Sequence, residues 1–178
     1  MSESKLLLSD NAVGLTLSRM AHEIALANEG VEKLVLVGIQ TGGAFLAERL
    51  ASQLEKVTGR PILCGKLDVS MFRDDIDERP LAEVHETDIP FDLDNAHVVL
   101  VDDVLYSGRT TRAALDGIMQ RGRPRRVQLA VLIDRAGHRE LPIEPNFIGK
   151  RQETQGDERI DVQLTEKGGR DEVYLTNP

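Results

Sequence analysis

The spacing of hydrophobic positions along the first part of the chain alternates between a helical and a strand-like period. Between Asp10 and Ala27, apolar residues return every three or four positions, which predicts an amphipathic helix. Leu34 to Ile39 is an unbroken apolar run and predicts a strand covered on both faces. The elements expected here are a helix capped by Ser9 and ending near Gly30, a strand over 34–39, a helix after Gly43 stopped by 59–61, and a strand over about 62–72.

The alternation resumes near residue 98, after a segment that interrupts it. Residues 73–94 are rich in charge, contain Pro80 and Pro90 and show little periodicity, so we expect a long surface loop or mobile hairpin. Strands that alternate with helices specify an α/β domain, and the lack of repeats predicts a single domain over residues 1–178. The later elements expected are strands over 98–104, 127–133 and 147–149, a helix over 110–121, and a C-terminal hairpin over about 158–176.

Composition narrows the class of protein without identifying it. A chain of 178 residues can bury a stable core, and its single cysteine, Cys64, excludes an internal disulfide. No apolar stretch is long enough to span a membrane, and Met1 to Asp10 lacks the basic start of a signal peptide, so we expect a cytosolic, cytoplasmic protein. The 22 basic and 30 acidic residues give a net charge of -8, which opposes nonspecific binding to nucleic acid but permits a local basic patch.

One loop in the second half of the chain carries the strongest chemical signal. An apolar strand ends in Asp102 and Asp103 and leads into residues 106–111, which are mostly small or hydroxyl-bearing. Backbone N–H groups at the start of the following helix favour a phosphate, whereas the two carboxylates suit sugar hydroxyls or a bridging divalent cation. This combination predicts a site for a ribose phosphate.

A P-loop, a receiver domain and a plain helix cap each fit this loop less well. A P-loop needs Gly-Lys-Ser/Thr after its strand, and no lysine reaches this loop. The paired acids of a receiver domain lie near the start of the domain, whereas Asp102 and Asp103 lie past its midpoint. An ordinary helix cap by Ser or Thr remains an alternative, although a cap alone would not require the two acids.

A second loop suited to an anion follows the strand at 34–39. The glycines of Gln40-Thr41-Gly42-Gly43 let backbone N–H groups approach a phosphate closely, although an ordinary glycine turn accounts for the same residues. In open parallel sheets, ligands bind beyond the carboxyl ends of the strands, which is where both loops fall. We therefore expect the two loops to contribute to one site.

Four segments of the chain carry a resemblance to a known family. They are Leu36-Val37-Gly38-Ile39-Gln40-Thr41-Gly42-Gly43, Phe72-Arg73-Asp74-Asp75, Asp103-Val104-Leu105-Tyr106-Ser107-Gly108-Arg109-Thr110 and Gly137-His138-Arg139-Glu140-Leu141-Pro142-Ile143. In order and spacing they resemble the PyrR family, which comprises pyrimidine operon attenuators that are also uracil phosphoribosyltransferases. The resemblance implies a type I phosphoribosyltransferase fold, with a mostly parallel sheet of about five strands, flanking helices, a flexible loop and a small hood.

The same resemblance implies a reaction and assigns residues to it. The phosphoribosyl group of phosphoribosyl pyrophosphate (PRPP) would pass to N1 of uracil, giving UMP and diphosphate. Asp102 and Asp103 would hold the ribose hydroxyls, directly or through Mg²⁺, and stabilise the cationic sugar. Arg73 and Arg79 would act from the 73–94 loop, which covers the site in the family. The phosphate-binding residues implied are Gln40, Thr41, Gly42, Gly43, Tyr106, Ser107, Gly108, Arg109, Thr110 and Thr111.

The chain also departs from the family pattern in places that affect the expected site. The common pyrophosphate loop reads Lys-Thr-Arg-Gly, so this chain lacks both cations and we expect weaker PRPP binding. The base pocket is implied at Asp134, Arg135 and His138, where Ala136 looks like a one-residue insertion. Relatives that use 6-oxopurines commonly carry Asp at the position of Tyr106, which argues against hypoxanthine or guanine.

RNA binding and self-association are further implications of the resemblance. Ser18, Arg19 and His22 share a helix face and match the pattern by which the family contacts the leader RNA of the pyrimidine operon. Lys150 is kept, but Glu144 stands where relatives often carry Arg, and from the sequence alone a solvated polar face is the more common explanation of the helix residues. The family binds RNA in response to UMP and forms homodimers and larger homo-oligomers. A regulator with little activity and an enzyme for another base remain alternatives.

Overall fold

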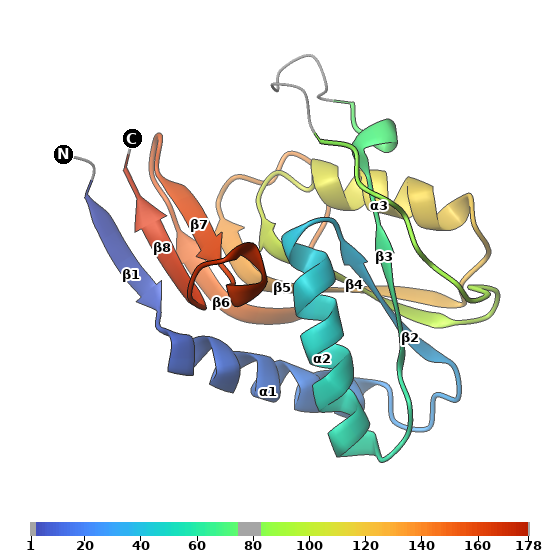
Figure 1. Cartoon of the computed structure of the whole chain (residues 1–178). Coiled ribbons are helices and arrows are strands. Elements are labelled where there is room, and N and C mark those ends of the chain that lie inside the picture. Colours follow the sequence, from blue (N-terminus) through green and yellow to red (C-terminus); the bar gives the residue numbers. More distant parts are fainter. Residues whose placement is uncertain (1–2, 75–82, 178) are drawn as a thin grey trace.

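A five-stranded parallel sheet forms the centre of the computed structural model, which describes residues 3–74 and 83–177 (Figure 1). Its strand order is β3-β2-β4-β5-β6, and each neighbouring pair is parallel. The strands are β2 (Leu34–Ile39), β3 (Leu63–Leu67), β4 (His97–Leu105), β5 (Arg126–Ala136) and β6 (Phe147–Glu153). The expected α/β fold class and its parallel sheet are confirmed.

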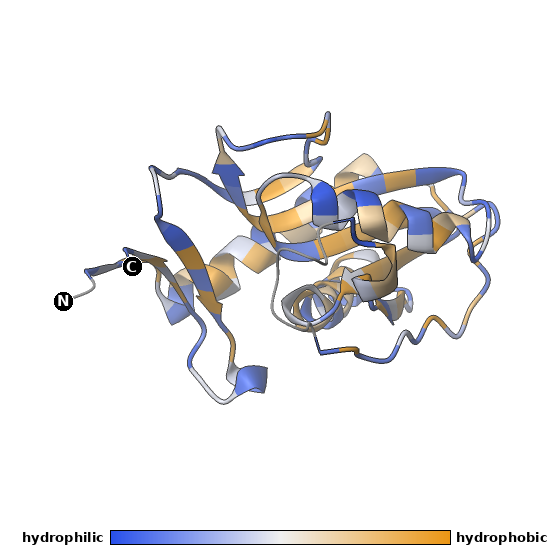
Figure 2. Cartoon of the chain, turned by 90° about the horizontal axis from the view of Figure 1, so that it is seen from above, coloured by the Kyte–Doolittle hydropathy of each residue, from blue (hydrophilic) through white to orange (hydrophobic). Residues whose placement is uncertain are grey.

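Helices cover both faces of this sheet, because successive residues of a strand point to opposite sides. On β4, Val99 and Val101 belong to the core shared with α1 and α2, whereas Val98 and Leu100 belong to the core under α3. The helices are α1 (Asp10–Ala27), α2 (Gly42–Thr58) and α3 (Arg109–Met119). In Figure 2 the hydrophobic colour is concentrated on the strands between these layers. No helix in the described part of the chain is long and apolar enough to cross a membrane.

A smaller antiparallel sheet forms a hood beside the main sheet (Figure 1). Its strands, in spatial order, are β1 (Ser4–Leu8), β8 (Glu172–Thr176) and β7 (Arg159–Gln163). The pair β7 and β8 confirms the expected C-terminal hairpin. The local pattern does not predict β1, because its partner lies at the far end of the chain, where Ser4 pairs with Thr176. Buried Val162 and Val173 join the core of α1 and α2 and so attach the hood to the main sheet.

The expected strand over 62–72 is too long. It ends at Leu67 in β3, and a short 3-10 helix, η1 (Ser70–Phe72), follows it. The chain turns at Asp68, whose carboxylate accepts hydrogen bonds from the backbone N–H of Ser70 at 2.8 Å and of His85 at 2.5 Å. Side chains of Asp commonly form such local turns, and this one ends the strand despite its favourable apolar pattern.

The segment expected as a surface loop or mobile hairpin over 73–94 lies at the surface and is attached to the sheet at several points where the structure describes it. Part of it, including Arg79, lies outside the described residues. Asp88 pairs with Lys66 of β3 through two backbone hydrogen bonds of 2.8 Å. Leu93 is buried, and Ile89 and Phe91 pack on the core beneath α3. The later half of the segment is therefore a strap along the edge of the sheet, held by apolar contacts that periodicity does not reveal.

Candidate active site

A cavity of about 460 Å³ lies beyond the carboxyl ends of β2 and β4, as expected for an open parallel sheet. Both candidate loops reach it. The predicted site residues that line the cavity are Gln40, Thr41, Gly42, Arg73, Asp102, Asp103, Tyr106, Ser107, Gly108, Thr110 and Arg135. The predicted residues outside its lining are Gly43, Arg109, Thr111, Asp134 and His138. The structure thus brings most of the predicted phosphate and ribose site together.

The paired carboxylates lie at the end of the central strand β4. Asp102 is almost fully buried, and its Oδ1 accepts the backbone N–H of Asp103 at 2.9 Å. Asp103 Oδ1 in turn accepts the N–H of Val104 at 2.8 Å, which orients the second carboxylate. Burial, followed by the neighbouring charge of Asp103, raises the pKa of Asp102 well above its ordinary value, while Arg73 opposes the shift. The pair therefore favours a bound cation or hydroxyl donors over two unpaired charges.

These two carboxylates fit Mg²⁺ better than a metal held by protein alone. Among the described residues, no group of three or more His, Cys, Asp or Glu side chains could hold a metal ion. Mg²⁺ usually takes one or two carboxylates and completes its octahedron with water and substrate phosphates. Asp102 and Asp103 supply that kind of partial site, at the wall of a cavity that also contains two phosphate-type loops.

The loop after β4 presents donors at the start of α3. Gly108, with φ of 93°, caps the helix in a left-handed conformation that favours glycine. Ser107 Oγ accepts the N–H of Arg109 at 3.3 Å, and Thr110 Oγ1 accepts a hydrogen bond from Arg73 at 2.8 Å. Arg73, on the segment after η1, thereby lies against the predicted phosphate-binding loop of residues 106–111.

Two predicted phosphate-binding residues of this loop do not line the cavity. Arg109 points away from the cavity lining and forms ion pairs with Asp74 at 2.7 Å and Glu140 at 2.6 Å. Thr111 is buried on the core side of α3, and its hydroxyl has no hydrogen-bond partner in the described part of the chain. Their spacing in the sequence does not distinguish them from Thr110, because helix geometry turns neighbouring residues to different sides.

At Gly43 the loop before α2 lies too close to the backbone of β4 for a side chain, and at Gly42 it lies against the side chain of Asp103. A Cβ on Gly43 would lie 2.3 Å from the carbonyl oxygen of Val101, and one on Gly42 would lie 2.4 Å from Oδ2 of Asp103. The peptide bond between Gln40 and Thr41 is cis. The side chain of Thr41, the N-cap residue, makes no capping hydrogen bond, so the start of α2 can present backbone N–H groups to an anion. The glycines therefore bring backbone donors beside the carboxylate pair.

The strap closes one side of this loop. Gln40 Nε2 donates to the carbonyl of Glu86 at 3.0 Å, and Thr41 Oγ1 lies 3.3 Å from Nε2 of His85. Because His85 N–H also bonds to Asp68, the strap, η1 and the glycine loop form one connected unit. The sequence pattern contains no signal for these contacts.

Of the predicted base-binding residues, Arg135 lines the cavity, whereas Asp134 and His138 lie outside its lining. Arg135 lies 4.1 Å from the ring centre of Tyr106 and lines the cavity, whereas His138 packs behind that ring at 5.2 Å. Asp134 is fully buried, and its two oxygens accept from Arg139 at 2.8 Å and Arg151 at 3.2 Å. Its side chain therefore holds arginines instead of facing the cavity. Arg139 also donates to the carbonyl of Tyr106 at 2.6 Å and so supports the phosphate loop.

The predicted RNA-binding residues gather on another part of the molecule. Arg19 Nη2 donates to the carbonyl of Gly149 at 2.6 Å, which brings α1 beside β6 and hence beside Lys150. Arg19 also pairs with Glu23 at 2.7 Å, and Nδ1 of His22 lies 2.8 Å from the carbonyl of Ser18. Ser18, Arg19 and His22 form a polar face of α1, and neither these residues nor Lys150 line the cavity. This face has fewer free donors than the sequence pattern suggests.

Sequence reasoning misses the contribution of the hood to the cavity. Ile160 of β7 and Lys167, from the 3-10 helix η3 (Thr165–Lys167), both line it. The predicted hairpin contains them, but the hairpin pattern does not indicate which side faces the site. Among the described side chains of the lining, Arg73, Arg135 and Lys167 are the cationic ones.

Comparison with known proteins is consistent with this geometry. Residues 7–163 match the model of the phosphoribosyl transferase domain. The chain is 49% identical to the bifunctional protein PyrR of Macrococcus caseolyticus, over 97% of this chain and 99% of that one. It is 47% identical to the bifunctional protein PyrR of Bacillus cereus, over 98% of both chains. A crystal structure of the hypoxanthine phosphoribosyltransferase of Trypanosoma cruzi has the same fold, with a TM-score of 0.73, 19% identity and coverage of 98% of this chain and 97% of that one.

Proposed function

Because this chain belongs to the PyrR family, whose members carry a phosphoribosyl transferase domain, we propose that it transfers the phosphoribosyl group of PRPP to uracil. The products are UMP and diphosphate. The observation that carries the proposal is the placement of Asp102 and Asp103 between two anion-binding loops on one cavity. This is the arrangement that a sugar with a phosphate on one side and a diphosphate on the other requires.

Each part of the cavity then has a defined task in the transfer. The donors of Ser107 to Thr110 bind the 5′-phosphate, assisted by Arg73. The N–H groups at Thr41 to Gly43 face the diphosphate, and Asp102 and Asp103 bind the ribose hydroxyls. Asp102 and Asp103 are the residues that would hold Mg²⁺, which would supply positive charge to stabilise the leaving diphosphate.

The reaction replaces one bond to the anomeric carbon by another. The bond from the anomeric carbon to the diphosphate oxygen breaks, and the leaving diphosphate keeps the electron pair. N1 of uracil supplies the pair for the new bond, and its proton passes to the released diphosphate or to water. The sugar is cationic in between, so the negative charge of the two aspartates stabilises it. Arg135 over Tyr106 forms the wall where the base would lie. Residues that fix sugar and base in line contribute by orientation more than by proton transfer.

The test is a panel assay of uracil, orotate, hypoxanthine, guanine and xanthine with PRPP and Mg²⁺. UMP formation should be specific for uracil and should fall by several orders of magnitude in the variant with Asp102→Asn and Asp103→Asn. The exposed Asp157→Asn, which removes a carboxylate outside the cavity, is the matched control. Equal activity of the double variant, or a preference for a purine, would refute the proposal.

A second function is favoured by a separate observation. The polar face of Ser18, Arg19 and His22 on α1 lies outside the cavity lining and contacts β6, the strand that contains Lys150, through Arg19. We propose that it binds leader RNA of the pyrimidine operon and that UMP strengthens binding. Binding should weaken as salt rises, because phosphate contacts release counterions. Arg19→Ala and His22→Ala should abolish binding of the RNA hairpin, while Lys56→Ala, which removes an exposed charge at the end of α2, should not.

A further inference from the structure

Among the residues that the structure describes, positive charge is scarce at the end of the cavity where the glycine loop lies. Gln40 to Gly43 contain no cationic side chain, although a diphosphate carries several negative charges. Arg73 is bonded to Thr110 of the other phosphate loop, and Arg135 is held over Tyr106 with hydrogen bonds to Thr154. The backbone donors of α2 therefore need a further cation if they are to hold this group firmly.

Lys167 lines the cavity, and its ammonium group is not paired with another described side chain. In residues 3–74 and 83–177, no side chain forms an ion pair or hydrogen bond with its ammonium group. Its position is nevertheless defined, because its N–H bonds to the carbonyl of Leu164 at 2.9 Å, and Leu164 is fully buried. The following Gly168, with φ of 86°, ends the turn in a left-handed conformation. A lysine on a fixed turn at a cavity wall loses less freedom on binding than one on a mobile loop.

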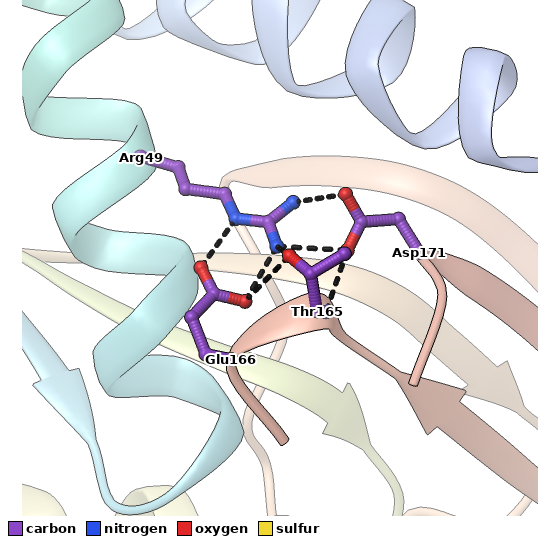
Figure 3. Close-up of polar contacts among 4 residues, drawn as sticks. All are labelled: Arg49, Thr165, Glu166 and Asp171. Atoms are coloured by element: carbon purple, nitrogen blue, oxygen red, sulfur yellow. Dashed lines mark hydrogen bonds and ion pairs between the residues drawn. The ribbon is translucent and has the colours of Figure 1, made fainter. Parts of the chain in front are cut away.

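The turn that carries Lys167 is fastened to α2 by Arg49 (Figure 3). The guanidinium donates to both oxygens of Glu166, at 2.8 and 2.5 Å, and to both oxygens of Asp171, at 2.7 and 2.8 Å. It also donates to the hydroxyl of Thr165 at 3.1 Å. One side chain thus fixes the residues before and after Lys167. We call the set Arg49, Thr165, Glu166 and Asp171 the Arg49 clamp.

The clamp also keeps acidic charge away from the lysine. Hydrogen bonds from Arg49 lower the pKa of both Glu166 and Asp171, so both stay ionised and paired with the guanidinium. Glu166 is adjacent to Lys167 in sequence and would otherwise be its natural partner. Because Arg49 occupies both carboxylates, the ammonium group remains available to an anion in the cavity.

The clamp links this turn to the glycine loop itself. Arg49 lies on α2 seven residues after Gly42, the first residue of the helix, which corresponds to about 10 Å along the axis. Figure 1 shows η3 beside the N-terminal half of α2, as the hydrogen bonds of the clamp require. The helix is therefore a rigid connection between the backbone donors at its start and the turn that carries the cation.

We propose that Lys167 binds the diphosphate arm of PRPP from the hood and that Arg49 is its positioning residue. This inference rests on the proposed phosphoribosyl transfer and adds a residue to it. The hood thereby supplies the charge that the glycine loop lacks, and it does so without placing a side chain at Gly42, where a Cβ would collide with Asp103.

The experiment compares Lys167→Ala and Lys167→Arg with Lys56→Ala as the control for loss of an exposed lysine. Lys167→Ala should raise the KM for PRPP by roughly fivefold to tenfold, as expected for one charge-assisted contact, and leave the KM for uracil unchanged. Lys167→Arg should restore most of the affinity, since it keeps the charge. Calorimetric titration with Mg²⁺-diphosphate should show the same order of affinities without requiring turnover.

A double-mutant cycle separates positioning from general stability. Arg49→Gln should raise the KM for PRPP in the wild-type background but have no further effect in the Lys167→Ala background, because the cation it positions is already absent. Additive effects would overturn the role of Arg49. Unchanged diphosphate affinity in Lys167→Ala would overturn the role of Lys167 and leave the proposed function intact. A wild-type protein that forms no UMP would refute the function, while the titration would still decide the role of Lys167.

Discussion

Replacement of Gly43 by alanine tests whether the glycine loop is shaped by its contact with β4. A Cβ at this position would lie 2.3 Å from the carbonyl oxygen of Val101 and 2.9 Å from Cα of Asp102. An ordinary contact is about 3.5 Å, so about 1 Å of separation is missing. The obstacle is backbone in a strand that pairs on both sides, with Gly38 of β2 and Ala130 of β5 opposite Val101. It cannot rotate away as a side chain would.

The expected cost follows from these contacts. Overpacking of a rigid site costs typically 1–3 kcal/mol, and we take about 3 kcal/mol because both partners are backbone. Alanine offsets about 1 kcal/mol of this, since it is the better helix former. The net loss of about 2 kcal/mol should lower Tm by about 4–8 °C in a domain of this size. Thermal unfolding followed by circular dichroism measures it directly.

Gly42→Ala is the matched control. Its Cβ would meet Oδ2 of Asp103 at 2.4 Å, and that atom can move because it ends a side chain. We therefore expect a Tm within about 2 °C of wild type but reduced turnover of PRPP, because Asp103 is displaced. The reasoning is refuted if Gly43→Ala has the same Tm as the wild type, or if Gly42→Ala has the lower Tm of the two variants.

Two further substitutions test the buried carboxylates. The raised pKa of Asp102 means that the unfolded chain loses this proton at lower pH than the folded protein does, so stability is lost as pH rises from the ordinary value of 3.8 through the folded pKa. Without ligand, Asp102→Asn should therefore have a higher Tm than wild type, and the difference in Tm should grow as pH rises through this range. A difference in Tm that does not change with pH would contradict this. Asp134→Asn should lower the free energy of unfolding by about 3 kcal/mol and Tm by about 6–12 °C, because it leaves Arg139 and Arg151 without a buried partner charge. Glu144→Gln, at an exposed carboxylate near the same arginines, should leave Tm unchanged, and equal effects of the two variants would contradict the assignment.

Periodicity and local chemistry were sufficient for the main sheet and its helices. Ser9 caps α1, and β4 ends where Asp102 and Asp103 enter the phosphate loop, because capping and unbroken apolar runs are properties of neighbouring residues. The same local signals fail at Leu67, where the Asp68 turn stops the strand earlier than its apolar pattern suggests. They also fail along the strap, whose contacts with β3 lie far away in the sequence.

The sequence by itself determined the order of the main-sheet strands and their helices, the paired acids and the two candidate anion-binding loops. Only the tertiary structure decided which candidate side chains share the cavity. It pairs Arg109 with Glu140 at the surface, pairs buried Asp134 with Arg139, and brings Lys167 to the cavity wall on a turn held by Arg49. The physical reason is that a residue type limits the charge and hydrogen bonds a position can offer. Which partner receives them depends on packing between segments distant in the chain, as in the clamp that joins α2 to the hood.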